Sequence, residues 1–368
     1  MDFGSINPAL LLASLMVAST PILLAALGEL VVEKAGVLNL GVEGMMITGA
    51  VVGFAVAVRL GDPGLGFVAA AGAGAGLSLI FALLTQVLMS NQVATGLGLT
   101  LFGLGLSSLI GSSFEGEKAP GMAKLDLPLL SDLPALGPIL FRHDAMVYLS
   151  LLLVGLVWAG LKYSRAGLIL RAVGENADAA HALGYKVVRV RVLAIVFGGA
   201  LAGLGGAYVS LVRVPQWVDG LTAGAGWIAL AIVVFASWRP WHVLIGAYLF
   251  GGLTVLQLNL QAAGVPLLKA LPVMLLALSV ASLAFTVIAR LVSGRGGLRA
   301  LLLWPALFAG LAGAVAALGQ ATGYPTGADT MLLSMSPYLV TILVLVILSL
   351  RGEHGAPGSL GRSFHPSS

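Results

Sequence analysis

Residues 66–89 read GFVAAAGAGAGLSLIFALLTQVLM and contain no charged side chain. A helix needs about 20 consecutive apolar residues to cross the hydrocarbon core of a bilayer, and this stretch is long enough to do so. On either side of it, further candidate spans occur at 8–27, 40–58, 93–112, 144–161, 190–213, 243–262, 268–290, 298–320 and 331–350, with a shorter apolar piece at 225–237. The pattern predicts an all-α, polytopic membrane protein with about ten or eleven transmembrane or re-entrant helices.

The composition supports lipid as the main solvent. Of the 368 residues, 59% are hydrophobic and only 9% are charged, and the mean hydropathy is +1.03. A soluble domain carries about 25% charged residues, so a chain this poor in charge would have nothing to cover a water-exposed surface. We therefore expect a single transmembrane domain over residues 1–368. The N-terminus lacks a positive region, so we expect the first apolar run to be a retained span and not a signal peptide.

The residue types that are missing exclude several kinds of chemistry. The chain has no Cys, which removes disulfides, thiolate metal sites and cysteine nucleophiles. None of its five His residues is paired with another ligand at metal spacing. We find no Ser–His–Asp pattern, no phosphate loop, no carboxylate pair suited to hydrolysis and no basic, aromatic-rich stretch for nucleic acid. We therefore expect no catalytic residue, no metal and no cofactor, and any ATP-driven step would need a partner chain.

Cations in the connecting segments indicate the orientation of the chain. They gather in four segments that the count of spans puts on one side of the membrane. These residues are Lys162, Arg165, Arg171, Lys186, Arg189, Arg191, Arg239, Arg290, Arg295, Arg299, Arg351 and Arg362. The positive-inside rule makes this side the cytoplasm, and it puts the long loop 113–143 outside. The C-terminus is then cytoplasmic, and the N-terminus lies outside if every candidate span, including 225–237, crosses.

Residues 28–46, GELVVEKAGVLNLGVEGMM, do not read as an ordinary span. Glycines interrupt the segment, and Asn39 and Glu43 lie four residues apart, so one helical face could present both. One interpretation is a discontinuous helix beside a transport path, because broken backbone at membrane depth is tolerated only inside protein or beside a wet cavity. The other is a cytoplasmic loop followed by a helix with a charged N-terminus, which needs no function. The residues alone leave both open.

The loop 163–190 is the most polar connection in the chain. Gly174, Glu175 and Asn176 form a start signal for a short helix at 177–183, and Gly184 is a good stop signal. A short helix held in a basic cytoplasmic loop is a natural docking element for a soluble protein. Alternatively, the loop is only solvated, and its cations do no more than set the topology.

Glycines and amides interrupt several of the candidate spans. We expect the glycines to serve close helix packing, which small residues allow in lipid. They are Gly96, Gly98, Gly103 and Gly105 in one span and Gly198, Gly199, Gly203, Gly205 and Gly206 in another. Asn91 and Gln92 open the span at 93–112 and could face a polar cavity.

Four segments, in order, resemble the motifs of one family. AGVLNLGVEGMM (35–46) resembles the N-I-G-x-E-G-M-M signature of the permease subunits of bacterial ABC importers, in the simple-sugar and nucleoside branch related to the ribose permeases. Residues 90–106 are similar to the A-N-Q-V-V-x-G-L segment of these proteins and residues 164–184 to their cytoplasmic coupling loop. Residues 225–240 are similar to a fourth segment, which contains W-x-P at its end. The matches cover most of 8–262 and then the tail from about Leu332.

The resemblance implies the type II importer fold and the transport of a nucleoside or simple-sugar-like solute across the bacterial cytoplasmic membrane. It implies three partners: a cytoplasmic ABC ATPase that hydrolyses the ATP, a second and non-identical permease, and an extracytoplasmic solute-binding lipoprotein. Carried over by position, the coupling helix that seats in a cleft of the ATPase would be formed by Glu175, Asn176, Ala179, Ala180 and Gly184. The residues near the translocation pathway would be Asn39, Glu43, Asn91 and Gln92.

The chain departs from the family pattern at three places. Ala177 stands where the coupling loop usually has Pro, and Ser237 stands where the family usually has Gly or a neighbouring small residue. Residues 266–330 read as an extra helical pair, to which we assign no role.

An alternative function from another class is an ion-gradient-driven transporter. It would use Glu43 as the coupling carboxylate, because an intramembrane carboxylate is a functional candidate by default. The loop 163–190 argues against this alternative, since a secondary transporter has no need to build a docking element. A membrane-embedded enzyme, the third class, lacks a plausible catalytic constellation.

Overall fold

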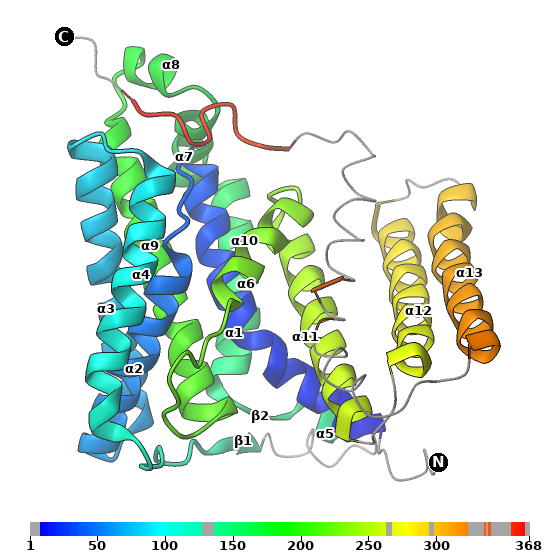
Figure 1. Cartoon of the computed structure of the whole chain (residues 1–368). Coiled ribbons are helices and arrows are strands. Elements are labelled where there is room, and N and C mark those ends of the chain that lie inside the picture. Colours follow the sequence, from blue (N-terminus) through cyan, green and yellow to red (C-terminus); the bar gives the residue numbers. More distant parts are fainter. Residues whose placement is uncertain are drawn as a thin grey trace. The chain divides into compact units, whose positions relative to one another are not determined.

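The structure is a computed structural model and describes residues 8–126, 136–262, 267–293, 298–322, 335, 338–339 and 355–364. The chain forms two compact units (Figure 1). The first comprises Met1–Tyr248 and Gly352–Ser368, and the second comprises Leu249–Arg351. Helix α11 (Pro240–Ala262) begins in the first unit and ends in the second.

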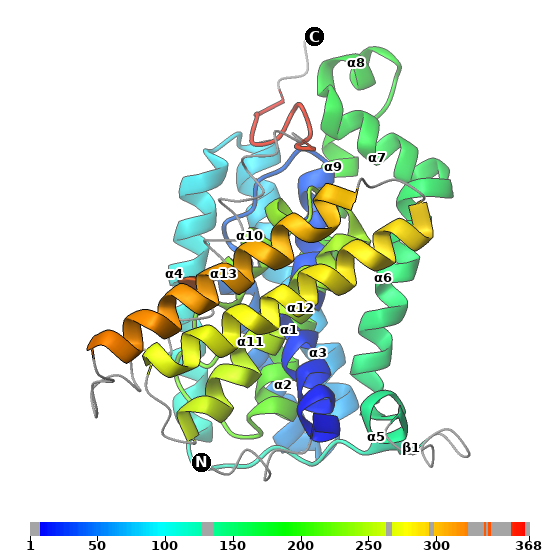
Figure 2. The same ribbon diagram turned by 90° about the vertical axis from the view of Figure 1, so that its right-hand side faces the viewer.

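The described part of the first unit is helical apart from one small sheet. Its helices, besides the start of α11, are α1 (Pro8–Lys34), α2 (Val42–Leu60), α3 (Pro63–Ala82), α4 (Gln92–Gly111), α5 (Leu136–Leu140), α6 (Ala145–Tyr163), α7 (Arg165–Glu175), α8 (Ala177–Ala182), α9 (Val187–Tyr208) and α10 (Ala225–Phe235). Strands β1 (Lys124–Asp126) and β2 (Arg142–Asp144) pair antiparallel, with Leu125 opposite His143. Figure 2 shows α6 running from the end of this unit that holds α5 and β1 to the end that holds α7 and α8.

Several of these helices are suited to cross a membrane. Within the described residues, seven segments are long and apolar enough: Leu12–Lys34, Val42–Leu60, Pro63–Val87, Gln92–Phe114, Ala145–Tyr163, Val187–Arg213 and Pro240–Ala262. They confirm the prediction of an all-α, polytopic membrane protein. Helix α10 has 11 residues, so it is about 16 Å long and covers about half of the hydrocarbon core. The candidate span at 331–350 lies almost wholly outside the described residues.

Helix α9 packs closely against α1, α2 and α3, and glycines make the contacts. A Cβ at Gly28 of α1 would lie 2.7 Å from the carbonyl oxygen of Gly198, and a Cβ at Gly49 of α2 would overlap the backbone of Gly203. Only glycine lets two helix backbones come this close. The predicted packing role is therefore confirmed for these α9 glycines.

The glycines of α4 divide into two sets. A Cβ at Gly103 would lie 2.6 Å from the carbonyl oxygen of Gly44 on α2, so Gly103 lies in a helix contact as predicted. At Gly98 and Gly105, by contrast, an added Cβ would meet no described atom within 4 Å. These two residues lie on the exposed face of α4 and take no part in the packing between the described helices of this chain.

Polar contacts join three elements at the end of the first unit that holds the small sheet. Asp144, the last residue of β2, caps α6 by accepting hydrogen bonds from the backbone N–H groups of Met146 (2.9 Å) and Val147 (3.1 Å). Its second oxygen accepts a hydrogen bond from the hydroxyl of Tyr208 on α9 (2.7 Å). A buried carboxylate needs such donors to replace water, and here they fix β2, α6 and α9 together.

The second unit consists of the end of α11 with α12 (Leu267–Ser293) and α13 (Leu298–Thr322). Its apolar core joins Leu253 and Leu260 of α11 with Met274 of α12 and Phe308 of α13. Helices α12 and α13 occupy most of the stretch at 266–330. Within them, Lys269–Val280 and Pro305–Ala321 form shorter apolar helical segments.

At three places the local structure differs in part from what the sequence indicated. Helix α1 continues through Gly28 to Lys34, because Gly28 is used to pack against α9, so the chain is broken only at residues 35–41. Asn39 lies in this break and not on α2, so it does not share a helical face with Glu43. The loop 163–190 contains the predicted short helix as α8, but residues 165–175 also form a helix, α7.

Candidate functional site

Buried polar side chains shape the break between α1 and α2. Gly36 lies in the break at φ +85°, a left-handed conformation that favours glycine. The side-chain oxygen of the fully buried Asn39 accepts a hydrogen bond from the N–H of Gly41 (3.0 Å), and the N–H of Asn39 donates to Oε1 of Glu29 (3.2 Å). Asn39 thus forms the side-chain turn that Asn favours, and Glu29 ties this turn to the last part of α1.

The two amides at the start of α4 have different positions. Gln92 is buried, and its Oε1 accepts a hydrogen bond from the N–H of Leu38 in the break (2.9 Å). Asn91 is exposed and caps α4 by accepting a hydrogen bond from the N–H of Ala94 (3.0 Å). Gln92 therefore belongs to the same buried group as Asn39, whereas Asn91 lies at the surface.

Glu43, in the first turn of α2, binds the start of the half-length helix α10. Its Oε1 accepts hydrogen bonds from the hydroxyl of Thr222 (2.5 Å) and the N–H of Gly224 (3.1 Å), and its Oε2 accepts one from the N–H of Gly226 (2.7 Å). The first N–H groups of a helix have no partner within it, and the helix dipole favours a negative charge there. Glu43, only 4% exposed, therefore serves as the cap of α10.

A second carboxylate holds the other end of α10. The indole N–H of Trp238, just after α10, donates to Oε2 of Glu33 on α1 (2.5 Å). Both carboxylates lie next to the break in sequence, Glu33 before it and Glu43 after it. Helix α10 is thus clamped at both ends by the segment that contains the break. Neither Thr222 nor Trp238 stood out in the sequence. The signal for both was the presence of Glu33 and Glu43, two carboxylates that need partners in an apolar chain.

Four of the five predicted coupling residues are exposed at the α7–α8 corner. Asn176 separates the two helices and caps α8 by accepting a hydrogen bond from the N–H of Ala179 (3.0 Å). Glu175, Asn176, Ala179 and Gly184 are exposed, and Gly184 ends the element at φ +86°. Ala180 instead faces inward and is only 2% exposed. Ala180 packs in the apolar cluster beneath the exposed surface of the corner, together with Val173 and Ala177.

Leu183 is a further residue of this corner that sequence analysis missed. It lies between α8 and Gly184, and 76% of it is exposed. Its apolar side chain lies beside the exposed coupling residues, where a contact with another protein would cover it. The signal in the sequence was the position of Leu183 directly before Gly184, the residue that ends the short helix.

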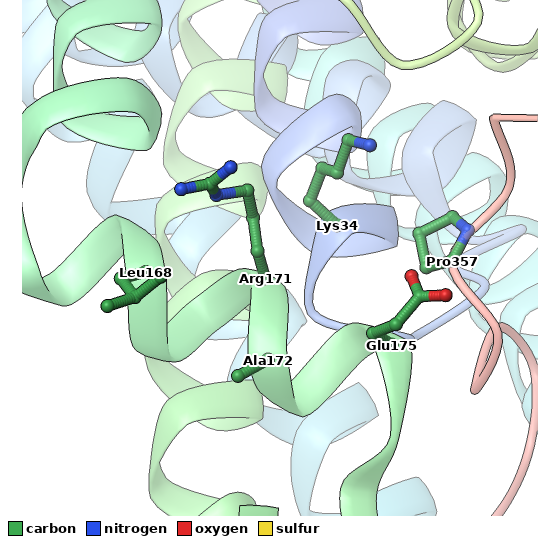
Figure 3. Close-up of a pocket in the computed structure, with 6 residues that line it drawn as sticks. All are labelled: Lys34, Leu168, Arg171, Ala172, Glu175 and Pro357. Carbon is green, nitrogen blue, oxygen red and sulfur yellow. The ribbon is translucent and has the colours of Figure 1, made fainter.

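A charged hollow opens beside the same corner (Figure 3). It has a volume of about 330 Å³ and is lined by Lys34 at the end of α1, by Leu168, Arg171, Ala172 and Glu175 of α7, and by Pro357. Small-molecule sites are mostly apolar, whereas this lining combines two cations with a carboxylate. The hollow therefore belongs to the charged surface of the corner. Within the described ranges, no group of three or more His, Asp or Glu side chains could hold a metal ion.

Comparison with known proteins identifies the family. Residues 11–293 match the family described as the permease component of the branched-chain amino acid transport system. The chain is 46% identical over 261 residues to a putative glucose ABC transporter permease protein of Haloferax volcanii, a match that covers 70% of this chain and 79% of the relative. No solved structure matches.

Three further relatives come from bacteria. A guanosine ABC transporter permease protein of Bacillus subtilis is 33% identical over 286 residues, which cover 74% of this chain and 88% of the relative. A nucleoside ABC transporter permease protein of Lactococcus lactis is 30% identical over 274 residues, which cover 72% and 86%. In Bacillus subtilis a second guanosine ABC transporter permease protein also matches, at 26% identity over 260 residues. The family match, the seven apolar segments of the described residues and the length over which the relatives match lead to one conclusion. This chain belongs to the permease-component family and is a transmembrane subunit of an ABC transporter, not an enzyme.

Proposed function

We propose that this chain is one of two permease subunits of an ATP-driven importer that carries a nucleoside or a simple sugar across the bacterial cytoplasmic membrane. The observation that carries the proposal is the exposed corner formed by α7 and α8. A permease has no ATP site of its own and needs a surface through which a soluble ATPase can act on it. The names of the glucose, guanosine and nucleoside relatives support the class of solute.

The coupling surface consists of Glu175, Asn176, Ala179 and Gly184, with Leu183 as an apolar contact. All five of these residues are exposed. Ala180 keeps the surface in place by packing inward. In an importer of this kind, ATP binding and hydrolysis in the partner would move this surface, and the motion would switch the helices between outward and inward access.

We propose that the residues near the translocation pathway act mainly by holding the break between α1 and α2 in place. Asn39, Glu43 and Gln92 are buried and bonded to backbone groups of the break or of α10. In our proposal they fix the geometry of a gate and do not bind solute. Asn91 is exposed and is the member of this set that is able to touch the solute or the second permease.

The partners follow from the same proposal. They are a cytoplasmic ABC ATPase at the α7–α8 corner, an extracytoplasmic solute-binding lipoprotein at the opposite end, and a second, non-identical permease. Two matching guanosine permeases in Bacillus subtilis support a permease pair of unlike chains. The C-terminal tail packs against α7 and therefore lies on the ATPase side, which we propose to be the cytoplasm.

The ion-gradient alternative is not retained. It needed Glu43 as a carboxylate that binds and releases an ion or a proton during transport. Both oxygens of Glu43 are instead engaged by three donors that hold α10. The chain belongs to an ABC permease family. In our proposal ATP hydrolysis by the partner drives transport, so no ion gradient is needed.

The test is a gentle detergent pull-down of the tagged chain from its native membrane, with mass identification of the copurifying proteins. We expect the wild-type chain to recover an ATPase and a second permease. Ala179→Trp adds a bulky ring on the exposed face of α8, so this variant should lose the ATPase and keep the second permease. In proteoliposomes, the wild-type complex should take up guanosine or glucose only when ATP is supplied.

Ala145→Trp is the matched control. Ala145 is also exposed, but it begins α6 at the end of the first unit that holds the small sheet. This variant should recover the ATPase like the wild type. Full ATPase recovery and unchanged solute-stimulated hydrolysis with Ala179→Trp would contradict the proposed coupling surface.

A further inference from the structure

The C-terminal tail is bound to the α7–α8 corner. Residues 355–364, the strap, read GAPGSLGRSF and lie beyond the family match, which ends at residue 293. Terminal segments rich in Gly, Pro and Ser are poorly ordered unless they are tied down. In this strap, Pro357, Ser359 and Phe364 are nevertheless buried. Figure 1 shows the strap, in red, beside α7 and α8.

Ser359 bonds to both sides of the joint between α7 and α8. The joint is the single residue Asn176, at φ −149° and ψ 101°. Hinge motions are absorbed by a few residues in loops or at the ends of helices, and Asn176 is such a residue. On the α7 side, the N–H of Ser359 donates to the carbonyl oxygen of Gly174 (2.8 Å). On the α8 side, Oγ of Ser359 accepts a hydrogen bond from the N–H of Ala177 (3.1 Å). Ser359 therefore links α7 and α8 across the joint at Asn176.

Phe364 fixes the end of the strap to the same corner. Its side chain is buried in an apolar cluster with Val173 of α7 and with Ala177 and Ala180 of α8. Its ring also meets that of His181 edge-on, with the centroids 5.3 Å apart. The strap therefore holds α8 through a packed side chain as well as through hydrogen bonds.

The strap also reaches the break between α1 and α2. The N–H of Gly361 donates to the carbonyl oxygen of Gly36 (3.2 Å). Arg191 of α9, which has no exposed surface, donates from Nε to the carbonyl oxygen of Ala35 (3.2 Å) and from Nη1 to that of Arg362 (3.0 Å). A buried cation is costly unless it is hydrogen-bonded, so this guanidinium holds the break and the strap at a fixed separation.

Backbone packs directly on backbone where α1, α7 and the strap meet. A Cβ at Gly174 of α7 would overlap the carbonyl oxygen of Lys34 at the end of α1. A Cβ at Gly358 of the strap would lie 2.6 Å from the carbonyl oxygen of Glu175. No side chain fits between these segments, and close-packed interiors transmit displacement. A movement of α7 must therefore carry the end of α1 and the strap with it.

We propose that the strap makes the α7–α8 corner and the break move as one body. A push on α8 then reaches Glu33 and Glu43, the two carboxylates that clamp α10. Ser359 and Arg191 are the positioning residues of this link. The proposal rests on the proposed function, because α8 is the segment on which the ATPase would act.

The test measures solute moved per ATP hydrolysed in the complete complex, reconstituted in proteoliposomes with guanosine and glucose as the solutes tried. In the double variant Ser359→Ala, Phe364→Ala, we expect normal copurification of the ATPase and the second permease. Hydrolysis should continue while solute per ATP falls about three-fold or more, within the range of mutations that weaken coupling. The control Ser363→Ala changes an exposed serine of the same strap and should keep the wild-type ratio.

The outcomes separate this proposal from a purely structural role. A lower yield with an unchanged ratio in the double variant would overturn the strap proposal. If the double variant does not assemble, Ser359→Ala alone removes the hydroxyl that binds Ala177. This single variant should still lower the solute moved per ATP about two-fold. A wild-type chain that recovers no ATPase would overturn the proposed function and the strap together, whereas wild-type transport with an unchanged variant ratio would overturn the strap alone.

A cross-link tests the position of the strap separately. The chain has no cysteine, and a Cβ at Gly355 would lie 3.5 Å from Cβ of Ser237, within the range of about 3.5–4.5 Å for disulfides. Mild oxidation of Ser237→Cys, Gly355→Cys in the assembled complex should therefore close an internal bond that neither single variant forms. Absence of this bond would mean that the strap does not begin beside the turn after α10, and the proposal, which depends on this placement of the strap, would fall.

Discussion

Ser237 lies at φ +47° in the turn after α10, and its neighbour Trp238 lies at +54°. An L-residue in the left-handed region costs about 1–2 kcal/mol, and glycine does not. The turn persists because the indole of Trp238 binds Glu33. We predict that Ser237→Gly relieves the strain, keeps the indole bond and raises the free energy of unfolding by about 1 kcal/mol. A higher melting temperature in detergent would be the readout.

Ala182→Gly is the control for this prediction. Ala182 is an exposed residue of α8, where glycine is less favourable than alanine by about 0.5–1 kcal/mol. The two glycine substitutions should therefore change the melting temperature in opposite directions. A decrease in both would show that Ser237 is not strained in the folded protein.

The buried polar residues were easier to single out in the sequence than their contacts were to predict. Asn39, Glu43 and Gln92 stand out because polar groups are costly in an apolar chain. Their partners could not be read from periodicity, since Thr222 is 179 positions from Glu43 and Leu38 is 54 from Gln92. The sequence therefore left a solute-facing role open, and only the folded chain reveals that these side chains hold backbone.

At the scale of helices, the seam between α2 and α9 should tolerate no side chain. A Cβ at Gly49 would overlap the backbone of Gly203, and forcing extra atoms into a packed seam typically costs about 1–3 kcal/mol. At Gly72 of α3, an added Cβ meets no described atom within 4 Å. We predict that Gly49→Ala lowers the melting temperature of the purified chain and its monodisperse yield, whereas Gly72→Ala leaves both unchanged or raises them slightly. Equal loss in the two variants would argue against the seam.

Apolar length predicted the long helices well and the short ones poorly. A length of about 20 apolar residues is a good guide where a helix crosses the whole hydrocarbon core, and it located the seven long segments. Helix α1 runs further than predicted because packing on α9 outweighs the low helix propensity of Gly28. Helix α7 was missed because it follows α6 after only Ser164, which caps it by accepting a hydrogen bond from Gly167 (2.9 Å).

For the whole molecule, the two ends of the first unit both carry cations. The orientation predicted from the sequence rested on the cations of the loop 163–190, on Arg239, on the segment 290–299 and on the tail. At the end with the small sheet lie Arg59, stacked on Phe114, and also Lys118, Lys124, Arg142 and Arg213. The α7–α8 end still carries the larger set, with Lys34, Lys162, Arg165, Arg171, Lys186, Arg189, Arg239 and Arg362. Acidic residues contribute little to orientation, so this excess predicts that the α7–α8 end faces the cytoplasm.

Because the chain has no cysteine, single cysteines can report this orientation without a background. Lys118 and Ala182 are both exposed, one in the segment before β1 and the other in α8. We predict that a membrane-impermeant maleimide labels Lys118→Cys on intact cells, and that it labels Ala182→Cys only after the membrane is opened. Ser363→Cys, exposed in the strap, should behave like Ala182→Cys. Labelling of Ala182→Cys and Ser363→Cys on intact cells would reverse the orientation, and α8 could then not meet a cytoplasmic ATPase.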